Sequence, residues 1–195
     1  MRALSAKSID PIASALIRAH ITADQVTIFG AAFSTFVSIK YLAQGDFLMG
    51  GILLSLIGLS DLLDGTMARL TGTAGSWGAF LDSTLDRIVD GAIYGSLIYF
   101  YSRDFALKSY LVIALVVGLL GAFVTSYTRA RWESLDVVGK VGLAERSERT
   151  IAMFTGLILT GLGLDVMAIV IYGLAIASGI TVLQRIMFVR KQLKK

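Results

Sequence analysis

Six long apolar stretches cover most of this sequence, and they constrain its fold more than any other feature. They lie at about residues 25–43, 47–69, 77–101, 107–129, 150–164 and 166–188. Each is near the ~20 residues that a helix needs to cross a bilayer, the fifth being the shortest. The mean hydropathy of +0.74 and a charged fraction of only 16% lie far outside the range of soluble proteins. We therefore expect an all-α integral membrane protein with six transmembrane helices.

The 195 residues leave room for one domain. Residues 1–21 mix polar and apolar side chains at roughly helical spacing, which predicts an amphipathic juxtamembrane helix that begins or kinks near Pro11. The alternative for this segment is a short surface helix packed on the bundle. The six-helix bundle is expected to span residues 22–188, followed by a basic tail at 189–195.

Residues 61–86, DLLDGTMARLTGTAGSWGAFLDSTLD, place four aspartates among the apolar stretches. An isolated carboxylate near the membrane centre costs roughly 2.5–3.5 kcal/mol on insertion scales, so the four need a compensating partner. Asp61 and Asp64 are three residues apart, and Asp82 and Asp86 are four apart. Each pair therefore shares one face of a helix.

The turn between these two pairs, at residues 71–75, is rich in glycine and could bring the pairs together. Four carboxylates in one place form an all-oxygen site, which suits Mg²⁺ or Mn²⁺ better than softer metals. The alternative is that the aspartates satisfy one another, or pair with Arg69 and Arg87, inside the bundle. Asp90 is expected to pair with Arg87 or to support the metal ligands from behind, and not to be a metal ligand itself. The absence of cysteine and the single histidine exclude thiolate catalysis and Cys- or His-rich metal sites.

The distribution of Lys and Arg predicts the orientation of the bundle. Six spans put both termini on one side, together with the basic loop at 129–149, whereas the opposite side holds Arg103, Lys108 and at most Lys40. The positive-inside rule therefore places the termini, and the aspartate turn with them, in the cytoplasm, most simply at the plasma membrane. The chain carries a net charge of +4, and its basic residues flank the apolar spans. This pattern favours contact with a membrane surface and with phosphate-bearing ligands over binding to nucleic acid.

A cluster of arginines lies on the same predicted side as the aspartates. Arg129, Arg131, Arg146 and Arg149 fall within 21 residues, and Arg185 returns to their level at the end of the sixth span. Guanidinium groups bind phosphate through paired hydrogen bonds. The cluster predicts a pocket for an anionic second substrate. The alternative is that these arginines set the topology and contact lipid headgroups.

The pattern D-x2-D-G-x2-A-R-x8-G-x3-D-x3-D is present in full, at Asp61, Asp64, Gly65, Ala68, Arg69, Gly78, Asp82 and Asp86. It resembles the signature of the CDP-alcohol phosphotransferase family, which comprises integral membrane enzymes that build phospholipid headgroups. The segments YTRARWESL and VGLAERSER, with the late Gln184-Arg185, are similar to those of its phosphatidylinositol phosphate and archaetidylinositol phosphate synthases. Many relatives begin the first span with P-N-x-V-T, whereas Asp24 takes the Asn position here.

The resemblance implies transfer of a phosphatidyl-type group from a CDP-activated lipid, such as CDP-diacylglycerol, to inositol phosphate with release of CMP. It implies two divalent ions, Mg²⁺ or Mn²⁺, on Asp61, Asp64, Asp82 and Asp86. Asp86 would also accept the proton of the attacking hydroxyl. The residues expected to bind the CDP-lipid are Asp24, Thr27, Asp61, Gly65, Ala68, Arg69, Gly78 and Asp82. Those expected to bind the acceptor phosphate are Arg129, Arg131, Arg146, Arg149 and Arg185. A homodimer is expected as well.

The glycines of the motif region divide into two expected roles. Gly51 and Gly58 are expected to serve close helix packing, whereas Gly65 and Gly78 interleave with the carboxylates and leave room for a ligand. Within the family, glycerol 3-phosphate as acceptor, as in phosphatidylglycerophosphate synthases, and CDP-archaeol as donor remain open. A divalent metal transporter is the alternative from a different class, because intramembrane aspartates can form an ion pathway. The clustering of the aspartates near one face disfavours it.

Overall fold

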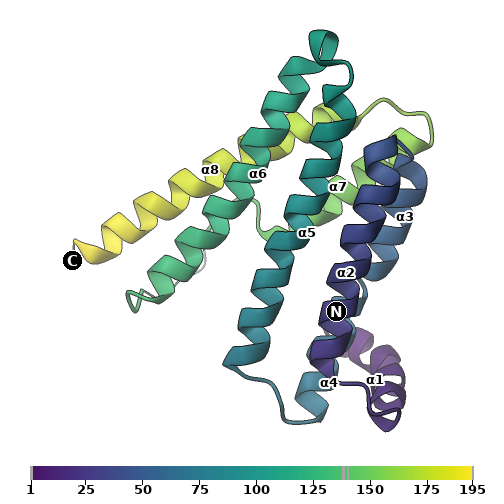
Figure 1. The fold of residues 1–195 in the computed structure, drawn as a ribbon. Helices are drawn as coiled ribbons and strands as arrows, with labels where there is room; N and C mark the ends of the chain where they lie inside the picture. Colours follow the sequence, from purple (N-terminus) through teal and green to yellow (C-terminus); the bar gives the residue numbers. More distant parts are fainter. Residues whose placement is uncertain (1, 138, 140, 195) are drawn as a thin grey trace.

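The computed structural model describes residues 2–137, 139 and 141–194, with the side chains of residues 2–8 and of Asp61 outside the description. The chain is helical throughout the described part, with no strand, which confirms the all-α class. Its elements are α1 (Arg2–Arg18), α2 (Ala23–Tyr41), the short 3-10 helix η1 (Leu42–Gln44), α3 (Phe47–Ile57), α4 (Ser60–Leu70), α5 (Ser76–Ser102), α6 (Phe105–Glu133), α7 (Arg146–Gly161) and α8 (Met167–Leu193) (Figure 1).

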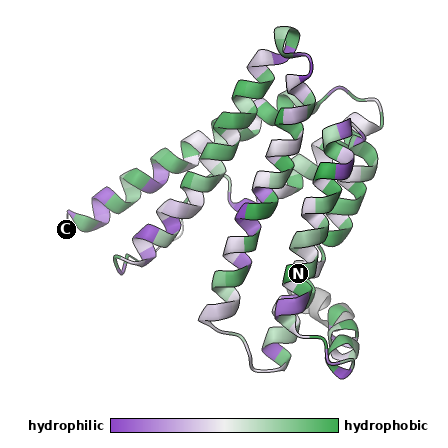
Figure 2. Cartoon of the chain, in the orientation of Figure 1, coloured by the Kyte–Doolittle hydropathy of each residue, from purple (hydrophilic) through white to green (hydrophobic). Residues whose placement is uncertain are grey.

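Four stretches of the described chain are long and apolar enough to cross a membrane. They are Ala23–Gln44, Phe47–Leu70, Phe105–Glu133 and Met167–Leu193. The prediction of six spans is not confirmed. The helix α5 carries the charged residues of the motif along its first half, and α7 has only 16 residues, but both helices lie where the third and fifth spans were expected. The molecule is a membrane protein by its apolar helices, along which Figure 2 shows many hydrophobic residues.

The second predicted span is interrupted by one tight turn. The helix α3 ends at Ile57, where the amide of Gly58 still bonds to the carbonyl of Leu54 at 2.9 Å. The Ser60 hydroxyl then donates to the carbonyl of Ile57 at 2.6 Å as α4 begins. Because the turn lies just before Asp61, the aspartate motif starts on its own short helix, α4.

The hydrophobic core lies where α2, α3, α5, α6, α7 and α8 meet. Its fully buried side chains include Val37, Leu42, Leu54, Leu97, Leu115, Leu157, Met167 and Ile171, none more than 2% exposed. The helices α3 and α7 approach closely, because a Cβ on Gly51 would lie 3.0 Å from Cβ of Leu157. A Cβ on Gly58 would lie 3.3 Å from the carbonyl oxygen of Leu54 and 3.7 Å from the ring of Phe154. The packing role expected for Gly51 is confirmed, whereas at Gly58 the neighbouring helix lies at an ordinary contact distance and its packing role stays a prediction.

The N-terminal helix packs on the motif. The helix α1 contacts α4 and buries Ala13 completely, with Pro11 inside the helix. The chain then turns through His20, whose φ is +59°, into a capping box in which the Thr22 hydroxyl accepts from the amide of Gln25 at 3.2 Å. A helix packed on the bundle is therefore present, and its placement on a membrane surface stays a prediction.

Candidate active site

Three helices and the start of a fourth enclose a pocket at the motif. The helices α4 and α5 both pack against α2, and side chains from all three line a cavity of about 380 Å³ together with Arg146. We call this cavity the aspartate pocket. Of the residues predicted to bind a CDP-lipid, it is lined by Asp24, Thr27, Gly65, Ala68, Arg69, Gly78 and Asp82. The eighth, Asp61, lies on α4, but its side chain is outside the described residues.

The carboxylate of Asp64 is fixed from two sides. The hydroxyl of Thr27 on α2 donates to Oδ2 of Asp64 at 2.7 Å, and the amide of Gly65 donates to Oδ1 at 2.5 Å. Asp64 is only 8% exposed. Because Thr27 lies on α2 and Asp64 on α4, this hydrogen bond joins the two helices at the wall of the pocket. Hydrogen bonds to carboxylates are among the stronger ones in proteins.

The rim of the pocket contains a contact that sequence reasoning missed. The indole nitrogen of Trp77, at the start of α5, donates to Oδ2 of Asp24 on α2 at 2.9 Å. Trp77 is 63% exposed. A tryptophan in the first turn of a helix carries no sequence signal for a partner 53 residues away, so only the packing of α5 on α2 reveals the pair.

The glycines of the pocket leave open space. A Cβ built on Gly78 would meet nothing within 4 Å, and one on Gly65 would meet only the Arg69 guanidinium, at 3.7 Å. Arg69 itself lies along α4, where its Nη2 donates to the Thr66 hydroxyl at 2.9 Å. Unlike Gly51, these two glycines are not needed for helix packing, so the space beside them is available to a ligand.

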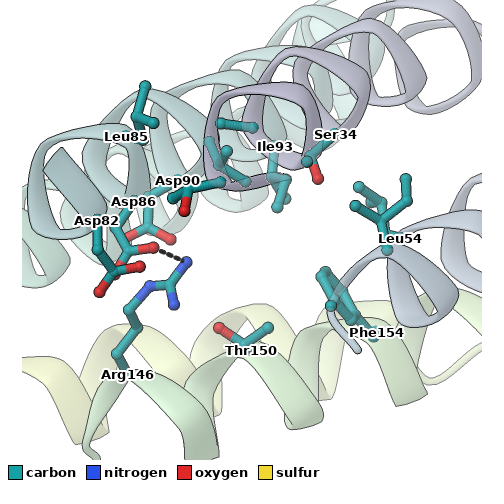
Figure 3. Close-up of a pocket in the computed structure, with 16 residues that line it drawn as sticks. Ser34, Leu54, Asp82, Leu85, Asp86, Asp90, Ile93, Arg146, Thr150 and Phe154 are labelled. Atoms are coloured by element: carbon teal, nitrogen blue, oxygen red, sulfur yellow. Dashed lines mark ion pairs between the residues drawn. The ribbon is translucent and has the colours of Figure 1, made fainter. Parts of the chain in front are cut away.

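A smaller cavity adjoins the aspartate pocket and shares Thr27, Asp82 and Arg146 with it. We call it the inner pocket. Figure 3 shows Asp82, Asp86 and Asp90 reaching it from α5, opposite Arg146, Thr150 and Phe154 of α7. Ser34 of α2 and Leu54 of α3 complete the side away from the carboxylates.

Asp86 faces a guanidinium in the inner pocket. Oδ1 of Asp86 lies 2.5 Å from Nη2 of Arg146, the ion pair drawn in Figure 3. On the other side Arg87 lies 3.9 Å from Asp86 and 3.2 Å from Asp90, and it also donates to the Ser126 hydroxyl of α6. The expected pairing of Asp90 with Arg87 is present, and it anchors the turn of α5 that follows Asp86.

The donor chemistry around the pockets fits a hard divalent cation. Asp64 and Asp82 line the aspartate pocket, and Asp82 and Asp86 line the inner one, so carboxylate oxygens from α4 and α5 face connected space. Within the described residues, no group of three or more His, Cys, Asp or Glu side chains comes together closely enough to hold a metal ion. The side chain of Asp61 is not among these described residues. The four-aspartate site therefore stays a prediction.

The arginines predicted to bind the acceptor phosphate lie in different surroundings. Arg146 lines both motif pockets, and Arg149 lines a small cavity beside Asp90. Arg131 and Arg185 line a groove between α6 and α8. Arg129 is exposed and pairs with Glu133 on its own helix at 2.9 Å. The five arginines do not line one common cavity, so their joint binding of one acceptor phosphate stays a prediction.

Two of these arginines hold the loop that leads into α7. Arg149, 5% exposed, donates to the carbonyl of Ala144 at 2.9 Å, and Arg185, 6% exposed, donates to the carbonyl of Val141 at 3.0 Å. The side chains of Thr181 and Gln184 on α8 accept from the amides of Ala144 and Leu143 at 3.0 and 2.9 Å. These contacts fix the backbone directly before Arg146.

Comparison with known proteins gives a consistent result. Residues 20–182 match the family model described as CDP-alcohol phosphatidyltransferase. The phosphatidylinositol phosphate synthase of Mycobacteroides abscessus is 39% identical over 95% of this chain and 84% of its own length. That of Cutibacterium acnes is 39% identical over 97% of this chain and 96% of its own.

Solved structures agree with these sequences. Mycobacterium tuberculosis phosphatidylinositol phosphate synthase (PgsA1) with CDP-DAG bound superposes with a TM-score of 0.86, at 35% identity and with 92% of each chain covered. The same enzyme in complex with manganese and citrate gives a TM-score of 0.85, at 35% identity, covering 92% of this chain and 88% of that one.

Proposed function

This chain belongs to the CDP-alcohol phosphatidyltransferase family, and we propose that it transfers a phosphatidyl group from CDP-diacylglycerol to inositol phosphate, with release of CMP. It is thus a membrane-bound transferase of phospholipid biosynthesis. The observation that carries the proposal is the aspartate pocket, in which motif residues of α2, α4 and α5 line one cavity. The relatives named above act in the same synthesis.

The chain's own residues would bind the nucleotide part of the donor lipid. The open space at Gly65 and Gly78 lets a ligand approach the backbone of α4 and α5. Arg69 lines the same space and can bind a phosphate oxygen, while Asp24 and Thr27 line the wall formed by α2. The acyl chains would stay in the bilayer beside the apolar outer surface of the helices.

The same carboxylates would hold the metal. We propose that Asp61, Asp64, Asp82 and Asp86 hold two divalent ions, Mg²⁺ or Mn²⁺. When bound, such ions neutralise a diphosphate and the charge that develops on the leaving CMP. The manganese complex of PgsA1 supports the choice of a divalent cation. Thr27 and the amide of Gly65 orient the Asp64 carboxylate for this role.

We propose that Asp86 accepts a proton during the reaction. Its side chain is 15% exposed and faces the inner pocket. A hydroxyl of inositol phosphate would give its proton to the Asp86 carboxylate while its oxygen bonds to the lipid-linked phosphorus. The bond from that phosphorus to the CMP oxygen breaks, and CMP leaves with the electron pair.

The acceptor needs a partner for its phosphate, and Arg146 lies beside Asp86 where it can supply one. Arg149 and Arg185, with Arg129 and Arg131 nearer the surface, would add positive charge on the same side. Glycerol 3-phosphate as acceptor needs the same arginines, and CDP-archaeol as donor needs the same apolar surface.

We further propose that the pockets open to the cytoplasm at the plasma membrane and that the enzyme works as a homodimer. The basic residues in the last turns of α6 and α8, Arg131, Arg190 and Lys191, support the proposed orientation. Cross-linking in native membranes and cysteine labelling from each side would test these two points.

A panel of acceptors tests the reaction. Purified protein would receive CDP-diacylglycerol, Mg²⁺ and one candidate at a time: inositol phosphate, inositol, glycerol 3-phosphate or serine. We expect CMP release with inositol phosphate and little with the others. CMP release with glycerol 3-phosphate alone would identify glycerol 3-phosphate as the acceptor in place of inositol phosphate. CMP release with none of the four candidates would contradict the proposal.

A further inference from the structure

One guanidinium lies where the two motif pockets meet. Arg146 lines both the aspartate pocket, with Asp64 and Asp82, and the inner pocket, with Asp82 and Asp86. Its Nη2 lies 2.5 Å from Oδ1 of Asp86 (Figure 3). Its side chain is 32% exposed and that of Asp86 15% exposed, so the pair is screened only partly by solvent. The Arg146 guanidinium therefore faces the carboxylates from which both the metal site and the proton acceptor are to be built, whereas Arg87 approaches Asp86 no closer than 3.9 Å.

The backbone beneath Arg146 is fixed, whereas its side chain is long. Arg146 is the first residue of α7, whose start is capped by Glu145 and Glu148, with the Glu145 amide donating to Oε2 of Glu148 at 2.7 Å. Ala144, two residues before Arg146, is held by Thr181 and Arg149. A change of partner at Arg146 thus needs only rotation of its side chain and no rearrangement of α7.

The ion pair and the reaction compete for the same oxygen. A divalent cation on Asp86 is repelled by a guanidinium 2.5 Å from that carboxylate, and Arg146 occupies the Oδ1 atom to which the attacking hydroxyl would otherwise bond. A phosphate group offers Arg146 an alternative partner with two or more acceptor oxygens. Asp86 and an acceptor phosphate therefore compete for Arg146.

We propose that Arg146 is a latch that couples the two ligands of this site. It pairs with Asp86 in the unloaded protein and passes to the phosphate of the acceptor, which leaves Asp86 to the divalent ion and to the attacking hydroxyl. Metal and acceptor phosphate consequently bind with positive cooperativity, and the coupling is reciprocal. The phosphate part of this inference rests on the proposed function, whereas the competition between Arg146 and the metal for Asp86 does not.

Metal binding without turnover tests the latch. Mn²⁺ affinity would be measured by electron paramagnetic resonance on the whole chain in detergent, without CDP-lipid, with and without inositol phosphate. We expect inositol phosphate to tighten Mn²⁺ binding about threefold or more in the parent protein. In Arg146→Gln, Mn²⁺ should bind about three- to tenfold more tightly without acceptor, and inositol phosphate should no longer change it.

Two further variants keep the test decisive. Arg190→Gln removes the same charge from the exposed end of α8 and should behave as the parent protein. Arg146→Lys keeps the charge but loses the paired hydrogen bonds, so it should give an intermediate Mn²⁺ affinity even where the glutamine variant folds poorly. Unchanged or weaker Mn²⁺ binding in both Arg146 variants, or coupling that survives in Arg146→Gln, would overturn the latch.

The failure of the latch can be told from the failure of the proposed function. If the protein releases CMP with inositol phosphate but its Arg146 variants bind Mn²⁺ like the parent, the latch is refuted and the proposed function is supported. If the protein releases no CMP with inositol phosphate but its Arg146→Gln variant binds Mn²⁺ more tightly, the proposed acceptor is refuted. The competition between Arg146 and the metal for Asp86 is then still supported.

Discussion

The indole nitrogen of Trp77 donates a hydrogen bond to Oδ2 of Asp24 at 2.9 Å, and this contact ties the first turn of α5 to the first turn of α2. Both helix starts border the aspartate pocket, because Asp24 and Gly78 line it. The contact therefore links two sides of the pocket at its rim and gives the Asp24 carboxylate a hydrogen-bond donor.

Trp77→Phe should raise the KM for CDP-diacylglycerol about three- to tenfold, because Asp24 loses its donor while the aromatic ring remains. The KM for inositol phosphate should change less than about twofold. Phe80→Leu is the matched control, since Phe80 belongs to the same exposed aromatic pair. Equal effects on both substrates would mean that Trp77 acts on overall packing. Steady-state kinetics with each substrate varied in turn provide the measurement.

Asp86→Asn should lower kcat by at least about 100-fold, because the amide cannot accept the proton of the attacking hydroxyl. Binding of CDP-diacylglycerol with metal should largely survive, as measured by equilibrium binding of a labelled liponucleotide. Asp90→Asn, one turn further along α5, should instead lower thermal stability through its lost pairing with Arg87 and keep most of the activity. Substantial turnover by the Asp86→Asn variant would remove Asp86 from the proton-accepting role.

Thr27→Val should weaken Mn²⁺ binding about tenfold, since the Asp64 carboxylate loses the hydroxyl that orients it at 2.7 Å. The same change at Thr160, near the end of α7, serves as control. Isothermal titration calorimetry of Mn²⁺ into the detergent-solubilised protein is the readout. An affinity equal to that of the parent protein would show that this hydrogen bond does not support metal binding.

Gly78→Leu should leave the thermal midpoint nearly unchanged and abolish measurable binding of CDP-diacylglycerol, because the added side chain meets only open space in the protein but fills the pocket. Gly161→Ala should show the reverse pattern. A Cβ there would overlap Leu48, so the expected loss is about 1–3 kcal/mol of stability. A large drop in stability for Gly78→Leu would mean that this glycine serves packing. Thermal melts and liponucleotide binding of both variants decide the point.

The sequence predicted the all-α class and the approximate position of the apolar helices, because apolar runs of near 20 residues have few alternatives in a membrane. The break before Ser60 was not predicted, since Gly58 and Leu59 are ordinary residues in an apolar span and only the turn geometry sets α4 apart. Several motif residues line one cavity, but the motif did not predict that α2 would provide the surface on which α4 and α5 both pack.

The roles of the individual arginines could not be predicted from the sequence. A guanidinium binds a backbone carbonyl with the same donors that it offers to phosphate, so composition cannot tell a loop anchor from a substrate ligand. Arg149 and Arg185 bind the carbonyls of Ala144 and Val141 in the structure. Asp86 and Arg146 were assigned to different tasks from sequence, and their contact became visible only when α7 was placed beside α5.

The divalent-ion dependence of CMP release tests the central claim most directly, namely that aspartates of α4 and α5 hold the cations needed for transfer. Protein stripped with a chelator would be assayed with CDP-diacylglycerol and inositol phosphate while Mg²⁺ or Mn²⁺ is returned stepwise. Asp82→Asn would be assayed in parallel. We predict no release without the ion, full recovery in the parent protein and a recovery shifted to at least about tenfold higher ion concentration in the variant. Release by the stripped protein, or an identical titration for Asp82→Asn, would contradict it.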